Sequence, residues 1–416
     1  MSYDVAAIRA QFPALAEGAA HFDGPGGTQT PEPVARAVAA ALTAAVANRG
    51  TVTAAERRAE SIVAGAREAL ADLLGADPRG IVFGRSATEL TFHLSRTLAA
   101  GWGPGDEVVV SRLDHDCNVR PWMYAAEQAG ASVTFVDFDP KTGELTPEHL
   151  SAVLSERTVL VAITAASNLI GTRPDLPALA GLAHDVGAQL YVDGVHETAH
   201  VLPDLQASGA DFWVCSPYKF LGPHCGVLAA RPETLEPLQP AKLLPSTDEV
   251  PERFELGTLP YELMAGATAA VDFLADLVPQ QTGTRRERLV TSYAALEEHE
   301  ERLLSRLEAS LRQLPDIRIY SNAARRTPTL LFTVDGVDNH VVRQHLADLG
   351  VNAPASHFYA WEASHHLGLG AGGGVRVGLA PYTDDSDIDR LLVGLRTLPR
   401  GGAAAQGRGR EPRPEP

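Results

Sequence analysis

The chain has 416 residues, 45% of them hydrophobic and 6% aromatic, a composition that suits one large or two medium globular domains. Its 35 basic and 52 acidic side chains give a net charge of −17, which disfavours nucleic-acid binding because an acidic surface repels phosphate backbones. Apolar runs are short, and none approaches the roughly 18 residues needed to span a bilayer. We therefore expect a soluble protein that is not bound to a membrane.

The N-terminus and the cysteines indicate the compartment. Residues 1–20 mix acidic and basic side chains with apolar ones and lack a basic stretch followed by an apolar core, so no signal peptide is visible. The three cysteines, Cys117, Cys215 and Cys225, are too few and too unevenly placed for a disulfide framework. We expect a cytoplasmic protein.

In the first two-thirds of the chain, short runs rich in β-branched residues alternate with longer helical patterns, which is typical of βαβ units. The expected strands span residues 81–83, 107–111, 132–136, 159–164, 189–192, 211–215 and 226–229. The expected helices between them span residues 86–99, 121–129 and 174–186. This order predicts an α/β fold with a mostly parallel sheet of about seven strands, in which ligands bind at the carboxyl ends of the strands.

After Pro260 the pattern changes to a smaller α+β domain. We expect helices over residues 262–277 and 285–314, strands near 317–320, 329–334 and 374–379, and a last helix near 386–398. The tail over residues 401–416 has no large apolar side chain and is expected to be disordered. The predicted division is an N-terminal arm at 1–30, a large α/β domain at 31–278, and a small α+β domain at 279–400.

Lys219 directly follows a predicted buried strand, within the stretch Ser-Pro-Tyr-Lys-Phe-Leu-Gly-Pro at residues 216–223. Buried lysines are rare unless they are paired or used chemically. A desolvated lysine amine can attack an aldehyde and form an imine. Alternatively, the side chain extends from a loop to solvent, and the stretch by itself leaves both interpretations open.

Two further strand ends carry polar residues. Asp193 follows the strand predicted at 189–192, where a carboxylate can pair with a cationic ring nitrogen such as that of pyridoxal phosphate, or can simply form an Asp-Gly turn. Ser86 opens a helix as the first residue of a Ser-x-x-Glu capping box. The amides at that helix start, with the Thr88 hydroxyl, can bind a phosphate, although most capping boxes bind nothing.

His115 and Arg376 complete the set of candidate residues. His115 follows the strand predicted at 107–111 and either stacks on a cofactor ring or is an exposed loop histidine. Arg376, in an alternating strand of the small domain, either grips an α-carboxylate with two hydrogen bonds or is an edge-strand charge. His115, His196 and Cys225 lack the paired-ligand spacing of a zinc site, so no metal is expected.

Together, these motifs resemble the class V aminotransferase family of pyridoxal phosphate enzymes, of fold type I, and specifically its branch of cysteine desulfurases and selenocysteine lyases. The resemblance covers residues 21–398. The matching motifs, in order, are Phe-Asp-Gly-Pro-Gly-Gly-Thr-Gln at 22–29, Ser-Ala-Thr-Glu at 86–89, His115 with Asn118 and Pro121-Trp122, Ser-Asn-Leu-Ile-Gly at 167–171, Asp-Gly-Val-His at 193–196, Ser-Pro-Tyr-Lys at 216–219, Phe-Glu-Leu-Gly-Thr at 254–258, and Arg376.

The resemblance implies a role for each matched residue. Lys219 would bind the cofactor aldehyde and move the substrate α-proton, Asp193 would pair with the pyridine nitrogen, and His115 would stack on the ring. The remaining implied roles are the phosphate site for Ala87, Thr88, Ser216 and Tyr218, the neighbourhood of the phenolic oxygen for Asn168 and His196, and substrate binding for Gly26, Asn168 and Arg376. Gly257 and Thr258 match a segment that reaches the phosphate of the partner subunit, so a homodimer is implied.

One departure from the family lies at residues 354–368. Desulfurases carry a cysteine on a mobile loop there, which attacks the substrate sulfur and leaves a persulfide, whereas this interval contains no cysteine. A hydroxyl or an imidazole cannot hold a persulfide. Cys225 stands at a different motif position and is expected to be a small buried residue.

The same interval resembles a cysteine-desulfurase-like subgroup with a Phe-Tyr-Ala-x-Glu stretch, here residues 358–362. His357, Tyr359, His365 and His366 would supply an acid or base over the substrate, or the aromatic pair would pack the loop onto the small domain. Both interpretations stay open.

The sequence therefore predicts a pyridoxal phosphate enzyme that acts on a small amino acid, with a sulfur-containing one favoured, by C–S lyase chemistry. The alternatives are an aminotransferase or epimerase of the same class, and a non-catalytic cofactor-binding partner in sulfur transfer. The presence of Lys219, Asp193 and Arg376 together argues against the last of these.

Overall fold

The computed structural model describes residues 3–399, so the tail predicted at 401–416 lies outside the described residues. Its larger part is a seven-stranded sheet with the strand order β2-β8-β7-β6-β5-β3-β4. The strands are β2 (Ile81–Gly84), β3 (Glu107–Ser111), β4 (Ser132–Val136), β5 (Thr158–Thr164), β6 (Gln189–Asp193), β7 (Phe212–Cys215) and β8 (Gly226–Ala230). Only β8 runs against the others, since it is antiparallel to both β2 and β7. The prediction of a mostly parallel sheet of about seven strands is confirmed.

Both faces of this sheet are buried, which explains why its strands are almost continuously apolar. In β5, Leu160 and Ala162 pack into one apolar core and Val161 and Ile163 into the other. Helices α4 (Ala87–Ala99) and α5 (Arg120–Ala129) contribute to the first core, and α3 (Ala54–Leu74), α7 (Leu176–Asp185) and α10 (Tyr261–Ala275) are among the helices that contribute to the second.

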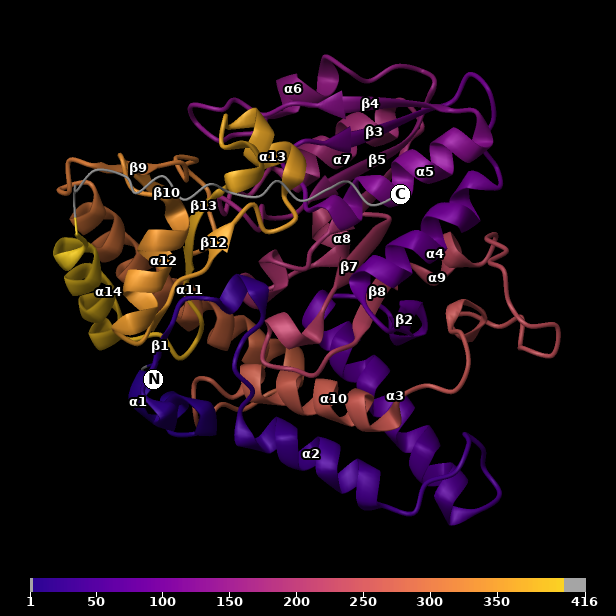
Figure 1. Cartoon of the computed structure of the whole chain (residues 1–416). Helices are drawn as coiled ribbons and strands as arrows, with labels where there is room; N and C mark the ends of the chain where they lie inside the picture. Colours follow the sequence, from indigo (N-terminus) through magenta and orange to yellow (C-terminus); the bar gives the residue numbers. More distant parts are fainter. Residues whose placement is uncertain (1–2, 400–416) are drawn as a thin grey trace, which may run out of the picture.

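The remaining helices of the larger part are short or peripheral. They are α1 (Val5–Arg9), α2 (Glu32–Thr43), α6 (Pro147–Ser151), α8 (Leu205–Ser208) and α9 (Pro232–Leu235). Figure 1 shows α2 lying along α10, which also packs against α3, away from the sheet. Among residues 3–399, no helix has both the length and the apolar character needed to cross a membrane.

The smaller part contains a four-stranded antiparallel sheet with the order β12-β13-β10-β9. Its strands are β9 (Ile317–Ile319), β10 (Thr329–Val334), β12 (Ala355–Ser356) and β13 (Gly374–Gly378), and its helices are α11 (Arg285–Leu311), α12 (Asn339–Asp348), α13 (Trp361–His366) and α14 (Asp385–Thr397). The N-terminal strand β1 (Ala20–His21) pairs in parallel with β11 (Val351–Asn352) and places Ala20 and Phe22 in the core of this part. The smaller core therefore draws on both ends of the chain.

The long helix α11 connects the two cores. Its first half contributes Tyr293 and Leu296 to the core beneath the large sheet, and its second half contributes Leu303 and Leu307 to the smaller core. Because one continuous helix is buried in both cores, it fixes the smaller sheet against the larger part.

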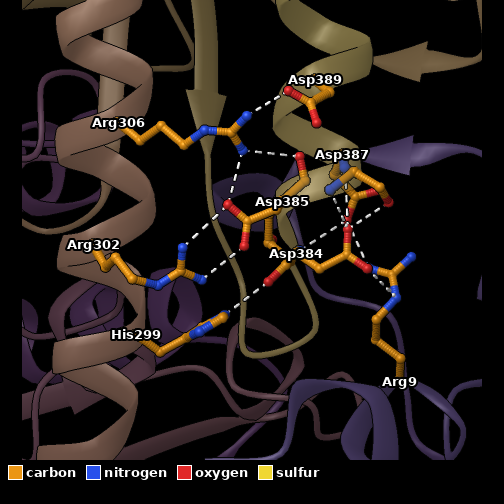
Figure 2. A network of polar contacts seen from close by, with 10 residues as sticks. Arg9, His299, Arg302, Arg306, Asp384, Asp385, Asp387 and Asp389 are labelled. Atoms are coloured by element: carbon orange, nitrogen blue, oxygen red, sulfur yellow. Dashed lines mark hydrogen bonds and ion pairs between the residues drawn. The ribbon is translucent and has the colours of Figure 1, made fainter.

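Figure 2 shows the charged network that fastens α14 to α11 and to the N-terminal segment. Arg302 and Arg306 of α11 pair with Asp385 at 3.0 and 2.8 Å, and Arg9 pairs with Asp387 at 2.6 Å. Carboxylates at the start of α14 also interact favourably with the helix dipole. Single exposed pairs contribute little, but this network joins three separate segments of chain.

A buried ion pair joins α3 to the edge strand β2. The guanidinium of Arg67 bonds both carboxylate oxygens of Glu255, at 3.0 and 2.9 Å, and Glu255 also accepts the backbone N–H of Phe83 at 2.9 Å. The two charged side chains are only 8% and 3% exposed. The pair therefore holds the segment that leads to Gly257 and Thr258 against the large part.

Replacing Arg67 should destabilise the fold strongly. Arg67→Met leaves the Glu255 carboxylate buried without its cation, and we expect the free energy of unfolding in urea to fall by about 3–5 kcal/mol. The control is Arg36→Met, which breaks the exposed pair of Arg36 with Glu32 and should cost about 0–1 kcal/mol. Equal losses in the two variants would contradict the importance of the buried pair.

Candidate functional site

A cavity lies at the carboxyl ends of the central parallel strands, between the large sheet and the smaller part. Its main chamber has a volume of about 690 Å³, which is within the range typical of ligand sites. An inner pocket of about 60 Å³ adjoins it, and both chambers are lined by Lys219, His115 and Asn168. Thus four loops that follow β3, β5, β6 and β7 converge here, as the fold class predicts.

Lys219 lies in the tight turn Pro217–Lys219 that follows β7. The side chain is buried, and Nζ donates a hydrogen bond to the carbonyl of Pro25 at 2.7 Å. Burial and the nearby charge of Arg376 lower the pKa of Lys219 to about 8, against the opposing effect of Asp193. The lysine therefore does not extend to solvent, and its amine is easier to deprotonate than an ordinary one.

Asp193 is the last residue of β6 and is buried beside the inner pocket. Its carboxylate accepts the backbone N–H of Val195 at 2.9 Å and lies 3.5 Å from the Cys117 sulfur, and burial raises its pKa. A Cβ at Gly194 would collide with the Trp213 ring, so glycine is required next to this carboxylate. The Asp-Gly pair therefore does more than form a turn, because it fixes a carboxylate in the wall of the cavity.

His115 lines both chambers and is partly buried. Its Nδ1 accepts the backbone N–H of Cys117 at 3.0 Å, which assigns the proton of the neutral ring to Nε2. Burial, followed by the charges of Lys219 and Arg376, lowers the pKa of His115 to about 3. The ring is therefore neutral and lines the cavity, and it is not an exposed loop histidine.

The start of α4 forms another wall of the inner pocket. Ser86 caps the helix by accepting a backbone N–H one turn later at 3.1 Å, and Ala87, Thr88 and Ser216 line the pocket. The first amides of a helix have no partner within it, so they are available to an anion. A Cβ at Gly226 of β8 would collide with the backbone of Ser86, so this glycine allows the strand to lie directly against the helix start.

Arg376 enters the cavity from β13, an interior strand between β12 and β10. The side chain is buried, its Nη1 donates to the carbonyl of Asn168 at 2.8 Å, and its Nε has no hydrogen-bond partner among the described residues. Burial lowers the pKa of Arg376 to about 9. A buried guanidinium with a free N–H is suited to a carboxylate ligand, and Gly26 lies next to it across the chamber.

Asn168 and His196 also line the inner pocket. The amide nitrogen of Asn168 donates to the carbonyl of Phe358 at 2.9 Å, while its Oδ1 is buried without a partner in the described part of the chain. The His196 Nε2 contacts the hydroxyls of Thr327 and Thr329, each at 3.0 Å, and burial lowers the pKa of this histidine well below its ordinary value. His196 is therefore neutral and is fixed by the smaller part.

Two predicted residues do not lie in this cavity. Gly257 and Thr258 are exposed after the short helix Glu252–Phe254 and line neither chamber. Their predicted contact is with the phosphate of a partner subunit, and it stays a prediction. The other predicted site residues line one chamber or both: Gly26, Ala87, Thr88, His115, Asn168, Asp193, His196, Ser216, Tyr218, Lys219 and Arg376.

No role for Cys117 is predicted from its sequence context, yet its side chain lines both chambers. Burial and the neighbouring Asp193 raise its pKa well above the ordinary value, so its thiol is protonated. Cys215 and Cys225 are 0% and 1% exposed, which agrees with the expectation that Cys225 is a small buried residue. The only sequence signal for Cys117 is its position two residues after His115. That spacing does not show that its side chain points into the cavity.

The loop at residues 354–368 places aromatic rings, not its paired histidines, in the cavity. His365 bonds the carbonyl of Trp361 at 2.8 Å and His366 bonds the carbonyl of Phe138 at 2.7 Å, whereas Phe358 and Tyr359 line the main chamber. His365 and His366 therefore do not fit the acid or base interpretation, while Tyr359 lines the chamber and stays a candidate for it.

Known proteins resemble the chain along almost its whole length. The family model for aminotransferase class-V matches residues 20–391. The uncharacterized protein MT3887 of Mycobacterium tuberculosis is 35% identical over 400 residues, covering 96% of this chain and 100% of that protein. The cysteine desulfurase CsdA of Escherichia coli is 27% identical, with a TM-score of 0.83 over 95% of this chain and 98% of that one. The structure of C-DES, with glycine covalently linked to its pyridoxal phosphate cofactor, shares the fold with a TM-score of 0.79, at 21% identity over 94% of this chain and 99% of that one.

The chemistry of the cavity fits pyridoxal phosphate independently of these similarities. A buried amine suits an aldehyde, a buried carboxylate suits a cationic ring nitrogen, and a helix start suits a phosphate. The unpartnered Nε of Arg376 and Oδ1 of Asn168 are further polar groups that a bound ligand would satisfy. The chain belongs to the class V aminotransferase family and is a pyridoxal phosphate-dependent enzyme.

Proposed function

We propose that this enzyme acts on a small, sulfur-containing amino acid and cleaves its C–S bond as a lyase. The observation that carries the proposal is the buried amine of Lys219, in one cavity with Asp193 and Arg376. When bound, pyridoxal phosphate supplies an aldehyde that captures amines and a protonated ring that withdraws electrons from the substrate α-carbon. The chain itself must hold the cofactor, orient the amino acid and move protons.

Each polar group of the cavity has a place in this proposal. Lys219 Nζ would hold the aldehyde and then move the proton at the substrate α-carbon. Asp193 would hold the proton on the ring nitrogen, and the neutral ring of His115 would stack on the cofactor. The other proposed contacts are the phosphate with Ala87, Thr88, Ser216 and Tyr218, the phenolic oxygen with Asn168 and His196, and the substrate carboxylate with Arg376 and Gly26.

The state of the cavity thiol supports a lyase over a desulfurase. Thiolate attack on the substrate sulfur needs a deprotonated cysteine, but burial and Asp193 raise the pKa of Cys117. The loop at residues 354–368 contains no cysteine. Loss of sulfide from the β-carbon needs no protein thiol: the Lys219 amine would accept the α-proton, the electron pair left on the α-carbon would form a double bond to the β-carbon, and the sulfur would leave with the electron pair of the C–S bond and be protonated to sulfide.

The lowered pKa of Lys219 can be measured directly, because the chain has three lysines, Lys141, Lys219 and Lys242. In full-length protein freed of pyridoxal phosphate, so that the amine is free, reductive methylation with formaldehyde followed by peptide mass spectrometry should show Lys219 reacting with a midpoint near pH 8. Arg376→Gln should move this midpoint upward, because the arginine cation lowers the pKa of Lys219.

Exposed Lys141 serves as the internal control, since its reaction should not respond to Arg376→Gln. A midpoint for Lys219 at its ordinary value of 10.5, or one that is insensitive to Arg376, would contradict the electrostatic description of the site.

A substrate assay separates the possible reactions. The holoenzyme with L-cysteine should release sulfide, and the three-carbon remainder should hydrolyse to pyruvate and ammonia in equal amounts. Lys219→Ala should lose the visible absorbance of the bound cofactor and at least about a thousandfold of kcat/KM, since both aldehyde capture and proton transfer depend on that amine.

Other products in this assay would identify a reaction different from the proposed one. Alanine together with a protein persulfide would identify a desulfurase, a keto acid that retains its sulfur would identify an aminotransferase, and D-cysteine would identify an epimerase. A colourless wild-type protein that forms no product with any amino acid would contradict the catalytic proposal altogether.

We also propose that the protein is a homodimer. Gly257 and Thr258 are exposed next to Leu256, whose side chain is 56% exposed, and Leu244 is 97% exposed. Such apolar exposure is typical of a surface that another subunit covers. Light scattering should give about twice the chain mass of 44.1 kDa, and a monomer at micromolar concentration would contradict this assignment.

A further inference from the structure

The segment at residues 357–362 crosses from strand β12 of the smaller part to helix α13 and borders the main chamber. Phe358 and Tyr359 line that chamber, and their φ angles are 51° and 58°. Two consecutive aromatic residues in the left-handed region are unfavourable unless their surroundings hold them there. The contacts that hold this segment therefore indicate what it does.

Both strained residues are held through their backbone carbonyls by the larger part. The carbonyl of Phe358 accepts the side-chain amide of Asn168 at 2.9 Å, and the carbonyl of Tyr359 accepts the backbone N–H of Asp116 at 2.7 Å. Asn168 and Asp116 belong to the loops that follow β5 and β3 and line the cavity themselves. The segment is thus bonded across the junction between the two parts.

The two aromatic rings rest on the residues proposed to bind substrate and cofactor. The ring of Phe358 covers the guanidinium of Arg376, with 3.8 Å between the guanidinium carbon and the ring centroid. The ring of Tyr359 stacks on His115, with the centroids 5.5 Å apart and the planes inclined by 26°. A ring over one face of a guanidinium restricts its orientation and keeps water from that face.

Glu362 fixes the far end of the segment. Its carboxylate pairs with Arg112 at 2.8 Å and with Arg120, while Arg120 also pairs with Asp116 at 3.0 Å. The Glu362 side chain is only 15% exposed. Figure 1 shows α13, which contains Glu362, between the smaller sheet and the upper edge of the larger one. These ion pairs therefore join a segment of the smaller part to the larger part beside the cavity.

We propose that Phe358 and Tyr359 are positioning residues that orient Arg376 and His115, and that Glu362 keeps both aromatic residues over the main chamber. The inference rests on the proposed function only in treating the chamber as the substrate site. Breaking the Glu362 ion pairs releases residues 357–362 and opens the main chamber to solvent. The guanidinium of Arg376 then becomes more mobile.

Cys117 serves as a built-in reporter of this release. It lines the chamber, while Cys215 and Cys225 are buried in the core. In full-length protein freed of pyridoxal phosphate, Glu362→Gln should raise the rate of Cys117 alkylation by N-ethylmaleimide about tenfold, which corresponds to about 1.4 kcal/mol of opening free energy. In the holoenzyme, the same variant should speed amide hydrogen exchange of peptides within residues 354–368.

The matched control is Glu308→Gln. Glu308 also shares its carboxylate between two arginines, Arg312 and Arg326, its side chain is 16% exposed, and it lines neither chamber of the cavity. This variant should leave both the alkylation rate and the exchange unchanged. No acceleration in Glu362→Gln, or an equal acceleration in Glu308→Gln, would overturn the proposal.

If Glu362→Gln does not fold, Arg112→Gln keeps the inference testable. This change removes one of the two cations that Glu362 binds and should accelerate alkylation of Cys117 by a smaller factor. An unchanged rate in a folded Arg112→Gln protein would count against the fixing role of Glu362.

The positioning role of Phe358 has its own kinetic test. Phe358→Leu keeps an apolar side chain but removes the ring face from Arg376, so KM for the amino-acid substrate should rise about tenfold while kcat stays within about twofold. Phe358→Tyr restores a ring and should restore KM.

These outcomes are distinct from failure of the proposed function. An unchanged KM in Phe358→Leu with an active wild type would overturn the positioning role alone. Absence of turnover in the wild type would overturn the proposed function, while the alkylation experiment would still decide whether Glu362 holds the segment.

Discussion

The structure depends on one electrostatic constraint, the burial of two cations, Lys219 and Arg376, around a cavity with few counter-charges. Burial lowers the pKa of both groups, and the charge of Arg376 lowers the pKa of Lys219 further. Asp193 offsets this only in part, because its own pKa is raised by burial. Buried charges are costly unless paired, so the cavity is electrostatically suited to an anionic ligand. A phosphate and an α-carboxylate meet that requirement.

The fold supplies this cavity by bringing distant segments to one edge of a parallel sheet. Loops after β3, β5 and β7 provide His115, Asn168 and Lys219, the end of β6 provides Asp193, and the smaller part adds Arg376. The smaller part must therefore keep a fixed position relative to the large sheet. Helix α11, buried in both cores, and the ion pairs at the start of α14 provide that rigidity.

Much of this arrangement was predictable because the signals are local. Strand β3 has the predicted bounds Glu107–Ser111, since a fully buried parallel strand is an unbroken apolar run between polar ends. Helix α4 begins one residue later than predicted because Ser86 is its cap. Asp193 ends one buried strand and Lys219 lies in the turn that follows another, where ligand-binding residues of parallel sheets are found.

Contacts between residues far apart in the chain could not be predicted from the sequence alone. The reversed direction of β8 and the pairing of β1 with β11 leave no periodic pattern. Glu362 and its partners Arg112 and Arg120 are separated by 250 and 242 residues, so each reads as an ordinary surface charge. Cys117 turns inward in the short helix Asp116–Asn118, and the Asp193 carboxylate that it contacts there is 76 residues away in the chain.

The chemistry and the rigidity of residues 357–362 are consistent with each other. A nucleophile that must reach the substrate sulfur and then carry it away needs a loop that can move. Here the corresponding segment has no thiol and is bonded to the larger part through Asn168, Asp116 and the Glu362 ion pairs. Groups held in this way act in place, by orienting neighbours and excluding water. The remaining reactive group is the amine of Lys219, which suits the proton transfers of the proposed reaction.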